Sequence, residues 1–382
     1  MKQPDCVNQQ YLRLRSLSSS RVLILLTCSL FSLFTTVVEA TIYEVGPGKK
    51  YPLVEKVPWE TLVAGDEVQI HWRPQPYHTK WVLCRRGTKD KPIVVKGIPS
   101  EKGELPVIDG RRAMTRPQLR FWGEQRGIIK IGGARDPEDT MPAYIVIENL
   151  DIRSARPSFF YFCSDGLQKY FQNAAAIFIE KGEHITIRNC YLHDCGNGLF
   201  VAYDTKDLLV ENCSIYHNGI ANSYYEHNVY TEAAGITFQG NYLGPLRKNC
   251  LGNNLKDRSA GLVVRYNWIE SGNRQLDLVD SEGGDTIRFD PRYRSAYVYG
   301  NVLVKLEEDS NSQMILHRDI SSVNQRLTDE CRRYPQLIPI GSINPTLPDW
   351  EHDLQQCSQK HQMPGIRLHP NYHGYTLTDP RL

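Results

Sequence analysis

The stretch HNVYTEAAGITFQGNYL (His227–Leu243) aligns without a gap with NNLKDRSAGLVVRYNWI (Asn253–Ile269), 26 residues further along the chain. Both copies contain an Ala-Gly pair, at 234–235 and at 260–261, and both contain an Asn near the end, Asn241 and Asn267. A repeat with such a short period is typical of stacked, nearly equivalent units and not of a single globular core. The pair therefore predicts a solenoid.

Related segments extend this repeat over most of the chain. Each has alternating apolar residues, a polar corner with Asn or Gly and a second short apolar strand: IVIENLDI (145–152), ITIRNCYL (185–192), LVENCSI (209–215), ITFQGNYL (236–243), VVRYNWI (263–269) and YVYGNVL (297–303). Period-2 alternation indicates strands, and long helical periodicity is absent. A sandwich would need antiparallel hairpins with two-residue turns, whose signals are scarce here. We predict an all-β fold, a single-stranded right-handed parallel β-helix.

The polar corners predict a column of stacked side chains inside the solenoid. Asn tolerates the left-handed conformation that such a corner requires. The residues next to the corners are Cys190, Cys213, Asn241, Asn267 and Asn301. Stacked amides can satisfy one another, so we expect a structural role for these Asn residues. Cys190 and Cys213, one coil apart, are within reach of a disulfide, and two buried thiols explain the pair equally well.

The chain divides into three parts. Residues 1–40 contain basic residues, an apolar run from 22 to 38 and a small-residue cleavage site before Thr41. This pattern predicts a secretory signal peptide. A retained anchor is the alternative, and in both cases the folded part lies outside the cytoplasm, secreted or periplasmic. We expect the β-helix over 41–322 and an irregular, Pro-rich capping tail over 323–382. Export permits disulfides, and Cys331 and Cys357 are candidates to staple the tail.

The net charge of the chain does not favour any class of binding partner. Without residues 1–40 the chain has 41 basic and 41 acidic side chains. Nothing global therefore attracts it to nucleic acid or to an anionic membrane, and affinity for an acidic polymer must come from a local patch. We expect a monomer, no nucleic-acid partner and no membrane contact beyond the export signal.

One face of the solenoid is predicted to collect polar side chains. Successive side chains of a strand point to opposite faces, so inward Val229 and Leu255 leave Tyr230 and Lys256 outward. Aligning FVAYD (200–204), QLDLVD (275–280) and MILHRD (314–319) predicts two outward columns: Ala202, Tyr230, Lys256, Asp277 and Leu316, then Asp204, Glu232, Arg258, Val279 and Arg318. His227, Asn228, Asn253 and Asn254 stand at the strand entrance. A solvated face would also mix charges, but the Tyr and Asn residues and the long flanking loops favour a groove for an extended polymer.

Several segments resemble a known family. GDEVQI (65–70), GTKDKPIVVKG (87–97), LPVIDG (105–110) and NLKDRSAGLVVRYNWI (254–269) look like exported β-helix polysaccharide lyases, distantly those of the alginate lyase and chondroitinase B group. The resemblance covers roughly Thr41–Arg318 and implies a pectate-lyase-like solenoid that binds an extended acidic polysaccharide. In that group a Lys and an Arg on adjacent coils carry β-elimination, and calcium on carboxylates and an Asn neutralises the uronate.

The resemblance implies roles for individual residues. Lys256 matches the position of the catalytic Lys in that family. The next coil, RQLDLVD (274–280), departs from the strand that carries the catalytic Arg in the family, so Arg258 or Arg274 would take the place of that Arg. Glu232 and Asn228 would hold the calcium ion.

β-Elimination gives these residues a chemical rationale, because it begins with removal of a proton α to a carboxylate. As the base, Lys256 needs a lowered pKa, which Arg258 beside it favours. Tyr230 or His227 would protonate the leaving oxygen. Further side chains would bind the substrate: Asn228, Asn254, Asp277, Arg274, His317 and Arg318.

Other functions fit the same fold. A glycoside hydrolase would use paired carboxylates such as Asp277 and Asp280. An epimerase would share the proton abstraction. A non-catalytic glycan-binding or structural surface solenoid is the alternative from another class.

Overall fold

The computed structural model describes residues 40–283, 285–305, 314–317, 320–334, 336–368, 370, 375–376 and 378–381, without the side chains of 316–317 and 320–322. Apart from its last residue, the expected signal peptide lies outside the described residues. Among the described helices, none is long and apolar enough to span a membrane.

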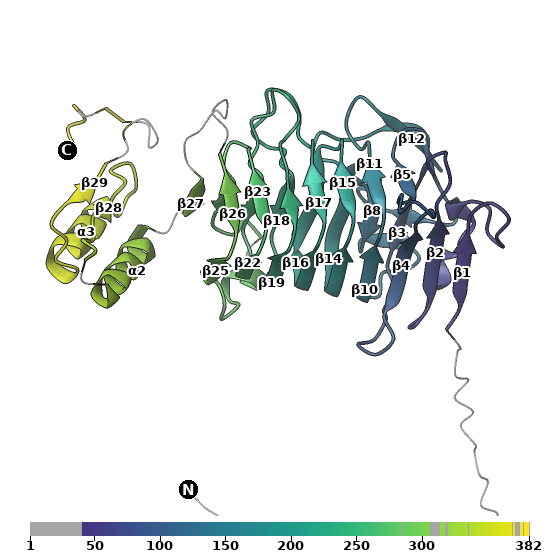
Figure 1. The fold of residues 1–382 in the computed structure, drawn as a ribbon, viewed down its shortest axis with the longest axis horizontal. Helices are drawn as coiled ribbons and strands as arrows, with labels where there is room; N and C mark the ends of the chain where they lie inside the picture. The colour runs from purple at the N-terminus through teal and green to yellow at the C-terminus, as the bar shows by residue number, and fades with distance from the viewer. Residues whose placement is uncertain are drawn as a thin grey trace, which may run out of the picture. The chain divides into compact units, whose positions relative to one another are not determined.

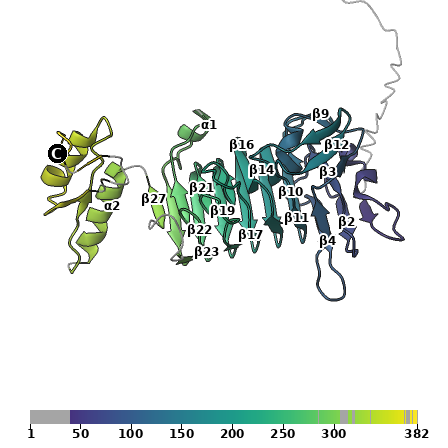
Figure 2. The same ribbon diagram turned by 90° about the horizontal axis from the view of Figure 1, so that it is seen from above.

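Parallel strands wind repeatedly through three faces of a solenoid, and the coils stack in one row (Figure 1 and Figure 2). Face 1 consists of β3 (Thr79–Leu83), β8 (Gly127–Ile131), the first parts of β14 (Ala175–Arg188) and β16 (Asn197–Glu211), β18 (Val229–Thr231), β21 (Leu255–Asp257), β24 (Leu276–Leu278) and β27 (Ile315–His317). Face 2 consists of β1 (Ile42–Val45), β2 (Glu67–His71), β4 (Ile93–Ile98), β10 (Ala143–Glu148), the second parts of β14 and β16, β19 (Ala234–Gln239), β22 (Ala260–Arg265) and β25 (Ala296–Tyr299). Face 3 consists of β5 (Val107–Asp109), β11 (Asp151–Arg153), β15 (Tyr191–His193), β17 (Ser214–Tyr216), β20 (Tyr242–Leu243), β23 (Trp268–Glu270) and β26 (Val302–Val304).

The registers confirm the 26-residue repeat on all three faces. Tyr230 pairs with Lys256 on face 1, Ile236 pairs with Leu262 on face 2, and Tyr242 pairs with Trp268 on face 3. The inward residues of the coils up to β24 form one continuous buried core, whereas Ile315 of β27 is 45% exposed. The predicted parallel β-helix is therefore confirmed.

Shorter elements decorate the early coils. They are β6 (Ala113–Thr115), β7 (Arg120–Phe121), β9 (Ala134–Asp136), the antiparallel hairpin β12 (Phe160–Cys163) and β13 (Gly166–Lys169), and the 3-10 helices η1 (Val54–Lys56), η2 (Trp59–Thr61) and η3 (Glu124–Arg126). The pairings of β6 with β3 and β12 bring this insertion onto β3, whose five residues are all buried.

The predicted column of amides lies inside the bend between faces 2 and 3. Asn241 Nδ2 donates to Asn267 Oδ1 at 2.9 Å, and Asn267 Nδ2 donates to Asn301 Oδ1 at 2.9 Å. The residue before each is left-handed, with φ of 65° at Gly240 and 58° at Tyr266. The amide bonds satisfy polar groups that no water reaches, which confirms their structural role.

Cys190 and Cys213 are two buried thiols and do not form a disulfide. All eight cysteines in the described part of the chain are free, including Cys331 and Cys357. The Cys190 thiol donates to the carbonyl of Arg188, and the Cys213 thiol to that of Glu211. The expected staple of the tail is thus not formed.

The C-terminal segment is more regular than its sequence suggests. It contains α2 (Ile320–Arg333), β28 (Gly341–Ser342), α3 (Trp350–Gln355), which continues into the π-helical turn η4 (Gln356–Lys360), and β29 (Ile366–Arg367). The buried stripe of α2 is Asn324, Thr328 and Cys331, and Asn324 bonds both backbone groups of Ser342. Because this stripe is largely polar, an apolar pattern does not reveal the helix. A capping role for the segment stays a prediction.

Candidate functional site

The outward side chains of face 1 form a ladder that changes from aromatic to charged. Phe178 pairs with Phe200, Phe200 with Tyr230, Tyr230 with Lys256, and Lys256 with Asp277. We call these five residues the face 1 strip. The predicted neighbours Tyr230, Lys256 and Asp277 are confirmed, and Leu316 continues the register.

The prediction is wrong one coil earlier. It placed Ala202 beside Tyr230, whereas Phe200 pairs with Tyr230 and Val201 with Thr231. A shift by two residues preserves the inward and outward alternation, so the pattern alone does not distinguish the two registers. The 15-residue strand β16 also runs through the bend without a loop to mark its end. Asp204 accordingly loses its expected place beside Glu232.

Aromatic rings form the floor of a cleft at this part of the strip. Phe200 stacks on Tyr230 with ring centroids 4.8 Å apart and planes 9° apart. The cleft is walled by residues 171–173 and by Tyr225 and Glu226. Flat aromatic surfaces beside a few polar groups suit the apolar faces of sugar rings.

Sequence reasoning missed this aromatic floor, although a signal exists. The triplets AIF (176–178), GLF (198–200) and NVY (228–230) each have a small or polar residue, an inward aliphatic residue and an outward aromatic residue. Aligning these triplets, and not the strand ends, recovers the correct register.

The hydroxyl of Tyr230 lies in a network of charged groups. Arg258 Nε donates to it at 2.9 Å, and the hydroxyl donates to Glu282 Oε2 at 3.5 Å. Arg258 also forms an ion pair with Glu282. Lys256 Nζ lies 5.5 Å from the centroid of the Tyr230 ring. Burial raises the pKa of Tyr230 although Arg258 opposes the shift, so the phenol keeps its proton at neutral pH.

His227 lies beneath the strip as a buried, neutral side chain. It is fully shielded from solvent, and its ring stacks against that of Tyr230 at 5.8 Å. Its Nδ1 accepts a hydrogen bond of 2.8 Å from the backbone N–H of Asn253, which leaves the proton on Nε2. Burial, and then the charges of Lys256 and Arg258, lower its pKa to about 3. The geometry supports a role in positioning Tyr230 and does not support direct proton transfer to a substrate.

Asp277, the register neighbour of Lys256, pairs with one cation, Arg274. Asn253 Nδ2 donates to Asp277 Oδ2 at 2.7 Å, and Arg274 Nη1 lies 3.6 Å from Asp277 Oδ1. Asp277 is 3% exposed. Its carboxylate therefore holds Arg274 on the coil that follows Lys256, and it is poorly exposed for the substrate contact that the sequence predicts.

Asn228 and Asn254 belong to the core. Asn228 Nδ2 donates to Asn254 Oδ1 at 2.9 Å, and Asn228 Oδ1 accepts from Asn218 Nδ2 at 3.0 Å. Both residues are fully buried. They form a second amide column, at the bend between faces 3 and 1, so the prediction that they bind substrate is wrong. The bend turns both positions inward, which strand alternation alone does not show.

The expected calcium ligands do not come together. The Glu232 carboxylate accepts hydrogen bonds from the Ser281 hydroxyl and from the Gly283 N–H, whereas the Asn228 amide is used in the core. The described residues contain no group of three or more His, Cys, Asp or Glu side chains suited to a metal ion. Glu232 instead anchors the loop 279–283.

The loop between β24 and β25 folds back over the coils that precede it. Its Arg292 carbonyl accepts from the Gly261 N–H at 3.0 Å. Gly235 and Gly261 have φ of 91° and 67°, and a Cβ on Gly235 would lie 2.6 Å from Arg292 Nη1. The loop therefore packs against the repeated Ala-Gly pairs, where the glycines leave room for it, and this packing brings Glu282 to Arg258.

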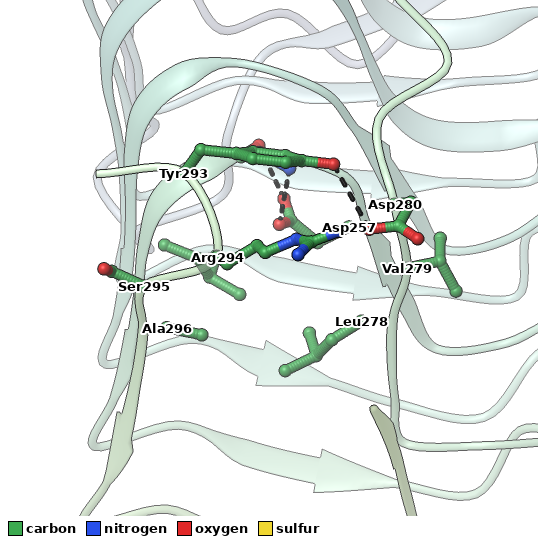
Figure 3. Close-up of a pocket in the computed structure, with 10 residues that line it drawn as sticks. Asp257, Leu278, Val279, Asp280, Tyr293, Arg294, Ser295 and Ala296 are labelled. Atoms are coloured by element: carbon green, nitrogen blue, oxygen red, sulfur yellow. Dashed lines mark hydrogen bonds and ion pairs between the residues drawn. The ribbon is translucent and has the colours of Figure 1, made fainter. Parts of the chain in front are cut away.

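A small cavity lies under the same loop, between Leu278 and Ala296 (Figure 3). Tyr293 donates to Asp280 Oδ1 at 3.2 Å at its edge. Asp257 faces it and accepts from Thr231 Oγ1 and from Ser259 Oγ, each at 2.7 Å. Burial raises the pKa of Asp257 to about 6 against these hydrogen bonds. The cavity belongs to the interior of the last coils and not to the face 1 strip.

Two predicted substrate contacts fall at the edge of the described chain. Arg318 lies outside the described residues. Of His317 only the backbone is described, paired with Leu278.

Comparisons with known proteins identify the architecture. A family described as "Right handed beta helix region" matches residues 127–289. The fold is a right-handed parallel β-helix. No curated protein matches the sequence.

Two solved structures are distantly similar to this chain. Pectate lyase Pel9A is 12% identical over 74% of this chain, with a TM-score of 0.41, and this chain spans 63% of its length. An alginate lyase from Paenibacillus sp. str. FPU-7 is 10% identical, with 66% of this chain and 92% of that chain covered and a TM-score of 0.32. The β-helix fold that the resemblance implied is confirmed by the family match. At such identities the names of these enzymes do not specify the substrate of this chain.

Proposed function

We propose that the protein is an exported lyase that cleaves a uronate-containing polysaccharide by β-elimination on the face 1 strip. The observation that carries the proposal is the order of that strip, in which the stacked rings of Phe200 and Tyr230 lead directly to Lys256. Sugar rings resting on the aromatic floor would place the next uronate at the charged end. The cations on either side, Arg258 and Arg274, would face its carboxylate.

Each residue has one task in this reaction. Lys256, acting in its neutral form, takes the proton from the carbon α to the carboxylate. The electron pair of that C–H bond forms the new C=C bond, and the bond from the β-carbon to the glycosidic oxygen breaks. Tyr230 gives its proton to the departing oxygen, since its raised pKa keeps it protonated at neutral pH. Arg258 and Arg274 stabilise the charge that develops on the carboxylate.

Hydrolysis by paired carboxylates has weaker support. Asp277 is only 3% exposed and is bonded to Asn253, so it is poorly placed to act on a sugar, and Asp280 is bonded to Tyr293 and paired with Arg294. Non-catalytic glycan binding would use the same aromatic floor, so the decisive experiment must separate binding from bond cleavage.

The test is to incubate the protein with polygalacturonate, alginate and chondroitin, with and without calcium, and to follow the ultraviolet absorbance of the unsaturated product. We expect Lys256→Ala to lower the rate by at least about 100-fold, the lower range for loss of a general base. Lys206→Ala, at an exposed lysine of β16 on face 2, is the matched control and should retain activity. New reducing ends without unsaturation would establish hydrolysis, and binding without new ends would overturn the enzymatic proposal.

A further inference from the structure

Face 3, away from the face 1 strip, carries a row of exposed aromatic side chains. The register places Tyr191, Ser214, Tyr242, Trp268 and Val302 in one outward column. The three aromatic residues are 43%, 38% and 47% exposed, in that order. Adjacent strands lie about 4.8 Å apart, so Tyr242 and Trp268 form a contiguous surface. A contiguous exposed apolar surface on a soluble protein commonly marks a binding site.

These two rings are held by one carboxylate. Tyr242 Oη and Trp268 Nε1 both donate to Glu270 Oε2, at 3.4 and 3.2 Å. The polar edges of both rings are thereby satisfied within the protein. What remains exposed is mainly their apolar surface, in a position fixed before any ligand arrives.

The early coils of the same face end in a cleft with an excess of positive charge. Five permanent cations line it: Arg111, Arg153, Arg156, Arg247 and Lys248. Three carboxylates offset them. Asp109 pairs with Arg111 and Arg153, and Asp194 pairs with Arg156 at 2.9 Å and with Arg247 at 3.4 Å. The third, Asp151, lies 2.9 Å from His193 Nε2. The cleft and its partners therefore have two more fixed positive charges than negative ones.

Crowding of like charges makes this cleft suited to an anion. Burial, followed by the positive charge of Arg156, lowers the pKa of Arg247. The same interaction implies that a bound carboxylate or sulfate would relieve the repulsion between the two guanidinium groups.

One stacked pair connects the cleft to the aromatic row. His193 lines the cleft, and its ring lies parallel to that of Tyr216, 5.1 Å away with planes 4° apart. Tyr216 belongs to β17, which pairs with β20, and it lies two residues along β17 from Ser214, the register partner of Tyr242. The cleft and the aromatic row therefore lie on neighbouring strands of one sheet, in the order β11, β15, β17, β20 and β23 (Figure 1).

We propose that this surface, the face 3 strip, is a second binding site for an acidic polysaccharide, distinct from the face 1 strip. Carboxylate or sulfate groups of the chain would occupy the basic cleft, and sugar rings further along the same chain would stack on Tyr242 and Trp268. Charge complementarity and the aromatic row together select this occupant over a neutral glycan, which would leave the cations unmatched. The choice of polymer class rests on the proposed function, and the site would hold the polymer to the enzyme between cleavage events.

The test measures binding in the Lys256→Ala background, so that no turnover occurs. Calorimetry with polygalacturonate, alginate and chondroitin sulfate, and with dextran as the neutral polymer, is repeated for two double variants, Tyr242→Ala/Trp268→Ala and Arg156→Gln/Lys248→Gln. We expect each double variant to bind at least one acidic polymer about tenfold more weakly, as loss of roughly 1.4 kcal/mol produces, and dextran not to bind. Trp122→Ala, at a tryptophan that is 60% exposed outside face 3, is the matched control and should bind normally.

The outcomes separate the two proposals. Unchanged affinity in both double variants, with affinity lost only in Phe200→Ala, would overturn the face 3 strip and leave the lyase proposal intact. Weakened binding in the double variants without unsaturated product from the unsubstituted protein would overturn the lyase proposal alone. A dimer by light scattering that Trp268→Ala dissociates would assign the surface to a second copy of the chain and overturn the inference.

Discussion

Lowering the pH from 7 to 5 should destabilise the protein through His227, and His227→Gln should remove that contribution. The imidazole is fully buried under Tyr230, and its pKa falls from 6.5 to about 3. Above pH 6.5 it is neutral in both the folded and the unfolded chain, so its contribution to stability is complete. As the pH falls through 6.5 towards 3, the unfolded chain takes up the proton first, and that stability is lost.

Integrating the difference in bound protons from pH 7 to pH 5 gives about 2 kcal/mol of lost stability. Glutamine does not titrate, and its side-chain oxygen can still accept the hydrogen bond from the backbone N–H of Asn253. The variant will be less stable at every pH because its packing against Tyr230 is worse. The informative quantity is therefore the change in unfolding free energy with pH and not its absolute value.

Urea unfolding followed by tryptophan fluorescence at pH 5, 7 and 8 measures this quantity. We expect the unsubstituted protein to lose about 2 kcal/mol more than His227→Gln between pH 7 and 5. Between pH 7 and 8 the two proteins should change equally, which serves as the internal control. Equal losses between pH 7 and 5 would refute the assignment of a buried, neutral imidazole, and with it the argument that His227 only positions Tyr230.

Three further outcomes follow from the same contacts. Asn267→Ala should lower the free energy of unfolding by about 3 kcal/mol, because it leaves the amide of Asn241 and buried carbonyls without partners. Asn301→Ala, at the end of the column, should cost less. Equal losses of the two variants in urea unfolding would contradict the column. Because the pKa of Asp257 is raised to about 6, the folded state holds this proton more tightly than the unfolded chain, and stability falls as the pH rises from 4 to 7. The unsubstituted protein should lose about 2 kcal/mol more than Asp257→Asn over that range. Identical pH profiles of the two proteins would argue against a raised pKa of Asp257. Phe200→Leu should raise KM for the polymer by about tenfold with kcat nearly unchanged, since the ring is proposed to bind substrate and not to react; a fall in kcat alone in steady-state assays would place it in the chemistry instead.

The repeat was the reliable guide to the site. Because side chains of parallel coils stack position for position, the gapless match of 227–243 with 253–269 correctly places Tyr230 beside Lys256. It fails at Phe200, where β16 continues through a bend and an alignment of strand ends slips by two residues. The amide column at 241, 267 and 301 was predictable because polar side chains at an inward position must satisfy one another.

The sequence by itself determined the parallel β-helix, the amide column and the adjacency of Tyr230 and Lys256, since all three follow from a period that repeats along the chain. Only the tertiary structure decided the surroundings of these residues. The bend buries His227 and Asn228, and the loop after β24 returns across more than 50 residues of sequence to place Glu282 at Tyr230. A periodic pattern specifies which residues stack, but the path of a loop depends on the surface on which it packs, here the glycines at 235 and 261 under Arg292.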